Sequence, residues 1–430
     1  MNWLVLLALT GVKVDHIPDP EGPIFSRALR APYVFDGGWF EFAPLTGDGM
    51  SAECACTTVT GARGEPIGFA RSTSAYCTKG PLSDDIEPGE MVWCLADQPL
   101  VTAGDDSGVP GLLMENASSN ACLRSEEFDN AAWVGDAGVT ANARQSPDGG
   151  LNADLIADTH DAGMACKTQV VSTTLQRRSA FGCYLSAGSA TSATIAMRGV
   201  GNSAGDCSAT TSGLDSAHYR RLQCGGAAAY GVGLTAVAVD VCVGNGVDVM
   251  GDIAVWGCQL EQVNPATSGL AHNFLTSYMP TTSSAATRVI STTVLDAGIA
   301  AWPDAGCAGG TVVLEWTPSA TIGTGSIVYT GNNGRELYPV TSTWRSLDGT
   351  NLATVTNAST AYVARRAASR WNAADGGLTV FDVTGGTSGT AAFDGLMETS
   401  VFMIGFSPAA LTPNGVIKQI IYDNSLTRCQ

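Results

Sequence analysis

Basic residues are scarce in this sequence: 22 Lys and Arg stand against 40 Asp and Glu, a formal net charge of −18 over 430 residues. A protein that binds nucleic acid needs basic side chains to displace the counterions of the phosphates. An anionic membrane surface makes the same demand. We therefore expect no nucleic-acid partner and no membrane insertion, whereas neutral polymers such as polysaccharides, and cations such as calcium, fit the composition.

Charged residues of both signs make up only 14% of the chain, whereas glycine occurs 51 times. Long surface helices carry Glu, Lys and Arg on their solvent-facing side, and few such residues are present. β-Branched runs interrupted by Gly, Asn, Asp and Ser are frequent instead, which is the pattern of strands joined by turns. The sequence predicts an all-β protein.

The apolar run near the N-terminus, Trp3 to Thr10, is too short to span a bilayer. It has the length of a signal-peptide core, but no Lys or Arg precedes it, since the first basic residue is Lys13. We favour a buried β-strand here, with a signal peptide as the alternative.

No Cys-x-x-Cys pair occurs among the 13 cysteines, and only four histidines are present, so a zinc ribbon or finger has no frame. One all-thiolate zinc site remains an alternative, formed by Cys54, Cys56, Cys77 and Cys94. So many cysteines are unusual in a reducing compartment. The sequence favours an oxidising environment with disulfides, and the odd count leaves at least one thiol free or paired between chains.

Motifs of catalysis are missing or incomplete. The Glu-x-Asp-x-x-Glu pattern of retaining glycosidases comes nearest at residues 127–132, where Ala132 replaces the last acid. A Gly-x-Ser-x-Gly pattern occurs at 201–205, with Asp215 and His218 downstream. The residues after this serine are typical of a loop, whereas a nucleophile elbow requires a helix. We expect no enzyme activity.

The hydrophobic pattern divides the chain into three regions. Residues 1–111 are irregular and rich in Pro, Gly and Cys. Residues 112–287 contain regular strands, such as Val237–Val243, where valines alternate with Ala, Asp and Cys. Residues 288–430 repeat this pattern after a polar linker at 280–287. We predict an N-terminal irregular β segment that acts as an anchor, a jelly-roll β-sandwich, and a second β-sandwich.

Several motifs occur in an order that resembles one family. They are Gly111–Asn120 (GLLMENASSN), Leu123–Trp133 (LRSEEFDNAAW), Val139–Ala143 (VTANA), Ile253–Glu261 (IAVWGCQLE), Ser277–Thr282 (SYMPTT) and Ala286–Arg288 (ATR). In this order they resemble tailed-phage and prophage virion proteins of the tail-fibre or head-fibre type. The resemblance implies a jelly roll like that of carbohydrate-binding modules, followed by a laminin-G or concanavalin A-like sandwich, which residues 311–430 match more loosely.

The sequence departs from this family at its cysteines. Cys122, Cys183 and Cys258 stand where the family usually has apolar residues. Cys207 and Cys224 flank residues 215–219 and could staple two adjacent strands, which typically contributes about 2–4 kcal/mol.

The resemblance to carbohydrate-binding jelly rolls also implies a structural calcium ion. Such domains commonly hold it by a carboxylate after the first-strand Phe and by an Asp that opens the last strand, and Asp129 and Asp252 match these positions. Calcium takes about six to eight oxygen ligands, so the two acids would supply only part of its shell. Solvated or capping acids are the alternative interpretation.

A candidate glycan site lies in the last domain. Aromatic rings stack on the C–H faces of pyranoses, while amides and charged groups bind the hydroxyls. The predicted loops there offer both kinds of side chain: Asn332, Asn333, Arg335, Tyr338, Trp344 and Arg345. For Tyr338 and Trp344, packing in the core is the favoured alternative.

These features together predict a non-catalytic, virion-associated adhesion protein, a fibre or decoration component whose lectin-like sandwiches bind a cell-surface glycan. Residues 1–111 would contact other virion proteins, and weak single sites would be multiplied in a homo-oligomer such as a trimer. The expected location is the virion, with secretion or cell-surface display as the alternative. Two other functions stay open: a purely structural spacer, and a secreted carbohydrate-binding accessory module of a hydrolase system.

Overall fold

The structure is a computed structural model, and the part of the chain that it describes contains strands and turns but no helix, hence none that could cross a membrane. The all-β prediction is confirmed. The apolar run of residues 3–10 lies outside the described residues. These are 39–41, 59–60, 66–70, 74–77, 86–94, 101–103, 110–115, 117–159, 163–173, 178–226, 228–244, 250–263, 275–288, 292–295, 309–318, 328–330, 335–340, 343–348, 350–356, 365–372, 377–392, 402–404 and 415–423.

Residues 118–288 form a β-sandwich of two sheets, which we call the first sandwich. Its seven-stranded sheet has the order β15-β12-β17-β10-β9, with β8 paired to β17 and β18 paired to β8. Its four-stranded sheet has the order β11-β16-β13-β14. The bounds are β8 Ser118–Asn120, β9 Gly138–Arg144, β10 Ala153–Asp158, β11 Cys166–Ser172, β12 Arg178–Ala187, β13 Ser192–Val200, β14 Cys207–Ser212, β15 Arg220–Gly225, β16 Ala236–Val243, β17 Gly251–Val263 and β18 Ala286–Arg288.

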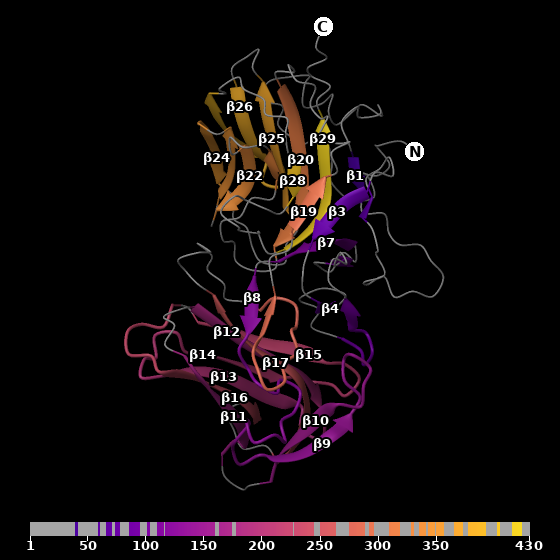
Figure 1. Cartoon of the computed structure of the whole chain (residues 1–430), viewed down its shortest axis with the longest axis vertical. Coiled ribbons are helices and arrows are strands. Elements are labelled where there is room, and N and C mark those ends of the chain that lie inside the picture. The colour runs from indigo at the N-terminus through magenta and orange to yellow at the C-terminus, as the bar shows by residue number, and fades with distance from the viewer. Residues whose placement is uncertain are drawn as a thin grey trace, which may run out of the picture.

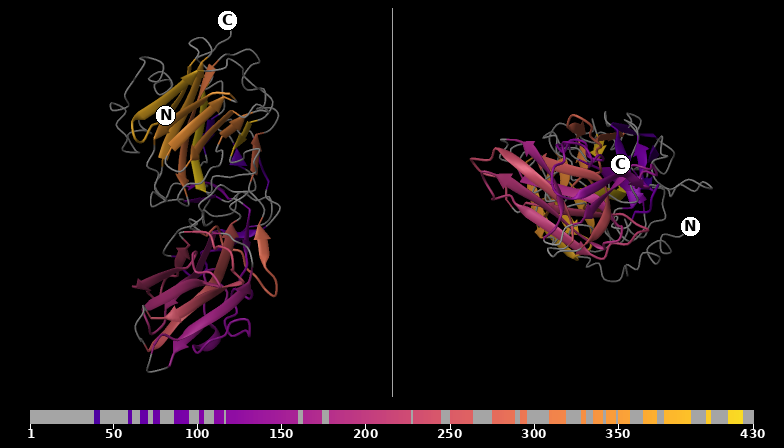
Figure 2. Two further views of the ribbon diagram at one scale, coloured as in Figure 1. Left: turned by 90° about the vertical axis from the view of Figure 1, so that its left-hand side faces the viewer. Right: turned by 90° about the horizontal axis from the view of Figure 1, so that it is seen from below.

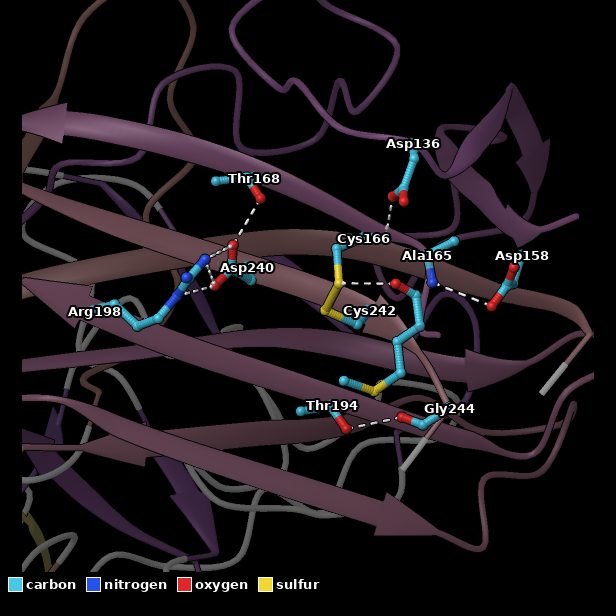
Figure 3. Close-up of a disulfide and its surroundings, with 11 residues drawn as sticks. Asp136, Asp158, Ala165, Cys166, Thr168, Thr194, Arg198, Asp240, Cys242 and Gly244 are labelled. Atoms are coloured by element: carbon cyan, nitrogen blue, oxygen red, sulfur yellow. Dashed lines mark hydrogen bonds and ion pairs between the residues drawn. A yellow bond between two sulfur atoms is a disulfide. The ribbon is translucent and has the colours of Figure 1, made fainter. Parts of the chain in front are cut away.

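The core of the first sandwich follows the alternation seen in the sequence. In β16, the four valines from Val237 to Val243 are fully buried between the sheets. Asp240 points the other way, where it accepts hydrogen bonds from Thr168 Oγ1 at 2.6 Å and from Arg198 Nε at 2.8 Å (Figure 3). The predicted period-two strand is confirmed, because successive side chains of a strand point to opposite faces.

A second sandwich is built from two eight-stranded sheets. One has the order β27-β26-β25-β20-β29-β7-β6, with β1 paired to β29, and the other the order β2-β3-β19-β28-β21-β22-β23-β24. The bounds are β1 Trp39–Glu41, β2 Val59–Thr60, β3 Pro66–Ala70, β6 Val101–Ala103, β7 Pro110–Met114, β19 Thr292–Leu295, β20 Gly309–Pro318, β21 Val328–Thr330, β22 Arg335–Val340, β23 Thr343–Asp348, β24 Leu352–Thr356, β25 Arg365–Asn372, β26 Gly377–Asp382, β27 Thr387–Ala392, β28 Phe402–Ile404 and β29 Gly415–Asp423.

The N-terminal strands differ from the expectation of a separate anchoring region that ends at residue 111. β1, β6 and β7 extend the sheet of β29, and β2 and β3 extend the sheet of β19. The remaining pair, β4 (Ala75–Cys77) and β5 (Val92–Cys94), forms a small sheet of its own. The physical reason is that β29 and β19 each need a hydrogen-bonding partner along their edge, which the N-terminal strands supply.

The chain passes four times between the two sandwiches, which form two lobes of the molecule. β1 and β3 lie in the upper lobe of Figure 1 beside β29 and β19, and β8 to β17 lie in the lower lobe. The turned view in Figure 2 shows the same end-to-end arrangement. The passes are β3 to β4, β5 to β6, β7 to β8 and β18 to β19, since residues 86–91 contact the lower lobe. Both lobes therefore depend on residues 39–114.

Three disulfides lie in the first sandwich. Cys166–Cys242 joins directly paired residues of β11 and β16 (Figure 3), and Cys183–Cys258 joins β12 to β17. The predicted Cys207–Cys224 disulfide is present, but the strands it joins are not adjacent in a sheet. β14 and β15 belong to opposite sheets, so this bond crosses the sandwich.

The other cysteines divide into one described thiol and a larger set that is not described. Cys122 is free and buried in the core. The zinc alternative cannot be placed on the structure, because residues 54 and 56, and the side chains of residues 77 and 94, lie outside what the structure describes.

Candidate functional site

A cluster of buried polar side chains joins the two ends of the first sandwich. We call it the clasp, and its members are Glu115, Arg221, Glu261, Ser277 and Arg288. Arg288 Nη1 lies 3.0 Å from Glu115 Oε2, and both side chains are at most 2% exposed. Ser277 donates to the same carboxylate from its backbone N–H and from its hydroxyl, each at 2.6 Å. The segment that enters the sandwich is thus fixed to the segment that leaves it.

A second buried carboxylate, that of Glu261, completes the clasp. It accepts hydrogen bonds from Thr276 N at 2.9 Å and from Ser118 Oγ at 2.6 Å. Nearby, Asn120 donates to the carbonyls of Cys258 and Met279. Ser118, Asn120 and Glu261 belong to the motifs that resemble virion proteins, so these motifs supply the contacts that close the domain.

The clasp brings buried charges of both signs together. Glu115 and Glu261 are each 1% exposed, and the guanidinium groups of Arg288 and Arg221 are also buried. Arg221 Nη1 donates to the carbonyl of Thr276 at 2.7 Å. Buried charges are tolerated when they are paired and hydrogen-bonded, so the clasp is a structural element with no net charge among these four side chains.

The outer face of the seven-stranded sheet carries an aromatic cluster. Tyr184, Trp256 and Tyr278 are at most 1% exposed, and the rings of Trp256 and Tyr278 lie 4.8 Å apart. The guanidinium of Arg221 lies 5.2 Å from the centre of the Tyr184 ring. Open aromatic sheet faces of this kind can stack on pyranose rings.

In this protein the aromatic face is covered by its own chain. We call residues 74–77 and 86–94 the cover. Its backbone bonds to Tyr219 through Ile86, in both directions, at 2.9 and 2.7 Å, and Met91 N donates to the carbonyl of Pro147 at 2.8 Å. Tyr76 places its ring 5.7 Å from that of Tyr278, in a stacked arrangement. The sheet face is therefore core and not an open platform.

Carboxylates line the seam between the cover and the sandwich. Tyr76 donates its hydroxyl to Asp148 Oδ2 at 2.9 Å, and Tyr278 donates to Glu126 Oε1 at 3.1 Å. Burial, and to a smaller degree the negative charges of Asp148 and Glu127, raise the pKa of Glu126 to about 7, although the Tyr278 hydrogen bond opposes this. The seam combines acceptors for hydroxyl groups with a group that titrates near neutral pH.

One aromatic ring of the cover faces solvent. Trp93 in β5 is 44% exposed, and its ring lies edge-to-face with Tyr76 at 4.9 Å. Sequence analysis missed this pair because residues 1–111 lack a regular pattern. The signal was present as two matching triplets, Ala-Tyr-Cys at 75–77 and Val-Trp-Cys at 92–94, which are the two strands of the small sheet.

The glycan-site residues predicted in the last domain lie mostly on strands, contrary to the expectation of loops. Arg335 and Tyr338 belong to β22, and Trp344 and Arg345 to β23, where Tyr338 pairs with Arg345. Asn332 and Asn333 lie outside the described residues.

Trp344 has the core position that was the favoured alternative. It is 0% exposed and contacts Trp316 of the opposite sheet at 5.8 Å between ring centres. The physical reason is that each strand of a sandwich turns every second side chain inward. A fully buried indole has no free face for a sugar.

The two predicted calcium ligands have separate surroundings. Asp252 Oδ1 accepts from Ser189 N at 2.7 Å and from Ser189 Oγ at 3.0 Å, whereas Asp129 is exposed. Within the described residues, no group of three or more His, Cys, Asp or Glu side chains is placed to hold a metal ion. Asp252 thus accepts hydrogen bonds from its own chain, as the alternative interpretation expects, and a calcium ion held by these two residues together with other oxygen ligands stays a prediction.

The serine of the Gly-x-Ser-x-Gly pattern and the histidine that followed it lie beyond opposite ends of β14. Ser203 precedes β14, and Asp215 and His218 follow its other end. His218 Nδ1 is 3.1 Å from Asp215 Oδ1. A strand, not a helix, follows the serine, so the local structure is not that of a nucleophile elbow.

No family model matches this chain, and no curated protein matches it in sequence. Among solved structures, it is similar to the enzymatically active domain of tailspike protein 4 of bacteriophage CBA120, with a TM-score of 0.27, 13% identity, and coverage of 34% of this chain and 21% of that chain. It is also similar to the full extracellular region of zebrafish Gpr126/Adgrg6, with a TM-score of 0.19 and 8% identity, over 62% of this chain and 34% of that chain. A third similar structure is the LG1-3 region of the laminin alpha2 chain, with a TM-score of 0.21 and 8% identity, over 61% of this chain and 65% of that chain.

The chain spans less than two thirds of the length of each of these structures. At TM-scores this low, the likenesses carry no argument about function.

Proposed function

We propose that this protein is a non-catalytic component of a tailed-phage type of virion, a fibre or decoration protein that attaches to cell-surface glycans. The observation that carries the proposal is the clasp. The motifs that resemble virion proteins supply Glu115, Glu261, Ser277 and Arg288, whose contacts close the first sandwich. The resemblance therefore rests on residues that define a domain, and not on scattered surface matches.

The disulfides support a location outside the cytoplasm. Three disulfides in one sandwich are typical of proteins that work in an oxidising, extracellular environment. A released virion meets that condition. The proposal includes a homo-oligomer, because single glycan sites on exposed surfaces are weak and several linked copies raise the avidity. Contacts with other virion proteins are assigned to residues 1–111.

The test uses the full chain with its disulfides intact on an array of immobilised glycans. We expect binding to a subset of glycans when the protein is displayed in several copies, and weaker binding by single copies. Absence of binding in every form would favour the structural spacer. Release of reducing sugar from a bound glycan would contradict the non-catalytic assignment and favour the hydrolase alternative.

A further inference from the structure

The exposed indole of Trp93 is unusual among the apolar side chains that the structure describes. Those residues include eight exposed large hydrophobic side chains, and the other seven are aliphatic: Val134, Leu151, Val170, Val200, Val232, Met250 and Leu352. An indole ring has a large apolar area, which is normally buried. A solvent-facing ring is therefore a candidate contact surface.

Trp93 is held in place by the residues behind it. It lies directly opposite Tyr76 in the pairing of β4 with β5. The Tyr76 ring is fixed in turn by Trp256 at 5.5 Å, by Tyr278 at 5.7 Å and by the hydrogen bond to Asp148. A contact residue that is already ordered loses little conformational entropy when a ligand binds.

A hydrogen-bond acceptor lies one tyrosine ring away from the indole. Asp148 is half-buried, and its Oδ2 accepts from Tyr76 at 2.9 Å while its Oδ1 accepts from Gly150 N at 3.0 Å. Acceptors beside an exposed aromatic face suit a ligand with C–H groups on one side and hydroxyl donors at its rim. A pyranose has this shape and this distribution of polar groups.

We propose that Trp93 is the stacking platform of a subsite for a neutral pyranose, with Asp148 as an acceptor for its hydroxyl groups. The negative charge of the residues around Trp93 favours neutral sugars over acidic ones. Glu87 and Glu90 belong to the cover and Asp148 to the seam, so a sugar carboxylate would be repelled. The subsite rests on the proposed glycan-binding function and gives it a location in the first sandwich and its cover.

The experiment compares the full chain with Trp93→Ala, Trp93→Phe and Leu151→Ala. Leu151→Ala is the matched control, because Leu151 is an aliphatic side chain that is 68% exposed. The probes are the methyl pyranosides of glucose, galactose, mannose and N-acetylglucosamine, with N-acetylneuraminic acid as the acidic comparison. Binding is followed by saturation-transfer NMR and by tryptophan fluorescence.

We expect at least one neutral pyranoside to bind with a dissociation constant of about 1 mM and the acidic sugar to bind more weakly. Trp93→Ala should weaken binding by about tenfold or more, Trp93→Phe by less, and Leu151→Ala should leave it unchanged. Unfolding midpoints of the variants show whether each remains folded, which is expected because Trp93 is nearly half exposed.

Two results would contradict the proposed subsite, and only the second would also contradict the proposed glycan-binding function. If the wild-type chain and Trp93→Ala bind glycans equally, glycan binding stands and the location at Trp93 is wrong. If the wild-type chain binds no neutral pyranoside and no glycan on the array, both the subsite and the proposed adhesion function fail.

Discussion

Burial of the Glu126 carboxyl near the cover changes the pH at which this group loses its proton. Glu126 has an ordinary pKa of 4.5, which its surroundings raise to about 7. Between these two values the folded protein keeps a proton that the unfolded chain has lost, so the free energy of unfolding falls as the pH rises through this window. Below about pH 4.5 the contribution is fully present, and above about pH 7 it is lost.

We therefore predict that Glu126→Gln makes the protein less sensitive to pH. The amide stays neutral, which removes a term of at most about 3 kcal/mol between pH 4.5 and 7, with solvent screening reducing it further. Urea unfolding of the wild type and of the variant at several pH values measures this. If the free energy of unfolding changes with pH in the same way in both proteins, Glu126 does not titrate between pH 4.5 and 7, and the prediction is wrong.

A second prediction at this scale concerns the free thiol. Burial raises the pKa of Cys122 well above its usual range, and the side chain is 0% exposed. Iodoacetamide reacts with the thiolate, so we expect no labelling of Cys122 in the folded protein at pH 8 and full labelling in denaturant. Peptide mass spectrometry of the labelled chain distinguishes Cys122 from the other cysteines. Labelling without denaturant would contradict the buried position.

At the scale of elements, the clasp links segments that are far apart in the sequence. β8 pairs with both β17 and β18, and the buried Glu115–Arg288 pair lies beside them. The contact holds the entry and exit strands together where the chain leaves for the second sandwich. Removing one charge alone leaves the other buried without its partner, which costs about 3–5 kcal/mol.

We predict that Arg288→Ala lowers the free energy of unfolding by about 3–5 kcal/mol. The double variant Glu115→Gln with Arg288→Met should recover part of this loss, because it removes both charges and keeps most of the volume. Denaturant unfolding of the three variants tests the pair. A double variant as unstable as Arg288→Ala would mean that the lost stability comes from packing and not from the unpaired carboxylate.

The disulfide that crosses the first sandwich allows a separate test at this scale. Cys207 and Cys224 are 17 residues apart, and their bond fixes β14 to β15 across the core. Replacing both by Ser should lower the free energy of unfolding by about 2–4 kcal/mol. Thr210→Ser, an exposed change in the same strand, is the control. A loss no larger than that of the control would show that the crossing bond does not stabilise the sandwich.

At the scale of the whole molecule, the two lobes share residues 39–114. These residues give five strands to the second sandwich and the cover to the first. A chain that begins at residue 112 would expose the edges of β29 and β19 and the aromatic face around Trp256. Unpaired strand edges and large open apolar surfaces promote aggregation.

We thus predict that residues 112–430 alone are poorly soluble, while a chain that lacks only residues 1–38 keeps all described strands. Size-exclusion chromatography and near-UV circular dichroism compare the two truncations. A monomeric, cooperatively folding 112–430 fragment would contradict the interleaved arrangement. For the same reason, glycan binding is to be measured on the full chain and not on residues 288–430.

Much of the first sandwich followed from the sequence. The alternation in Val237–Val243 predicted a strand with one face toward the core, and β16 is that strand. The candidate site did not follow, since Trp344 was indicated by its neighbours in sequence and proved to be buried. Apart from the matching triplets around Tyr76 and Trp93, nothing in the sequence placed Trp93 near this seam, because Tyr76 and the Asp148 that binds Tyr76 are 17 and 55 residues from Trp93 in the chain.

By itself, the sequence determined that this protein is all-β and that the valines of β16 share one face, which points between the sheets, because side-chain alternation is a local property. It also indicated a bond between Cys207 and Cys224. Only the tertiary structure decided that β1 and β3 complete the second sandwich, that Cys207 and Cys224 lie in opposite sheets, and that the cover closes the aromatic face. The backbone groups of a strand edge are alike in every sequence, so the pattern of side chains does not specify which strand becomes the neighbour.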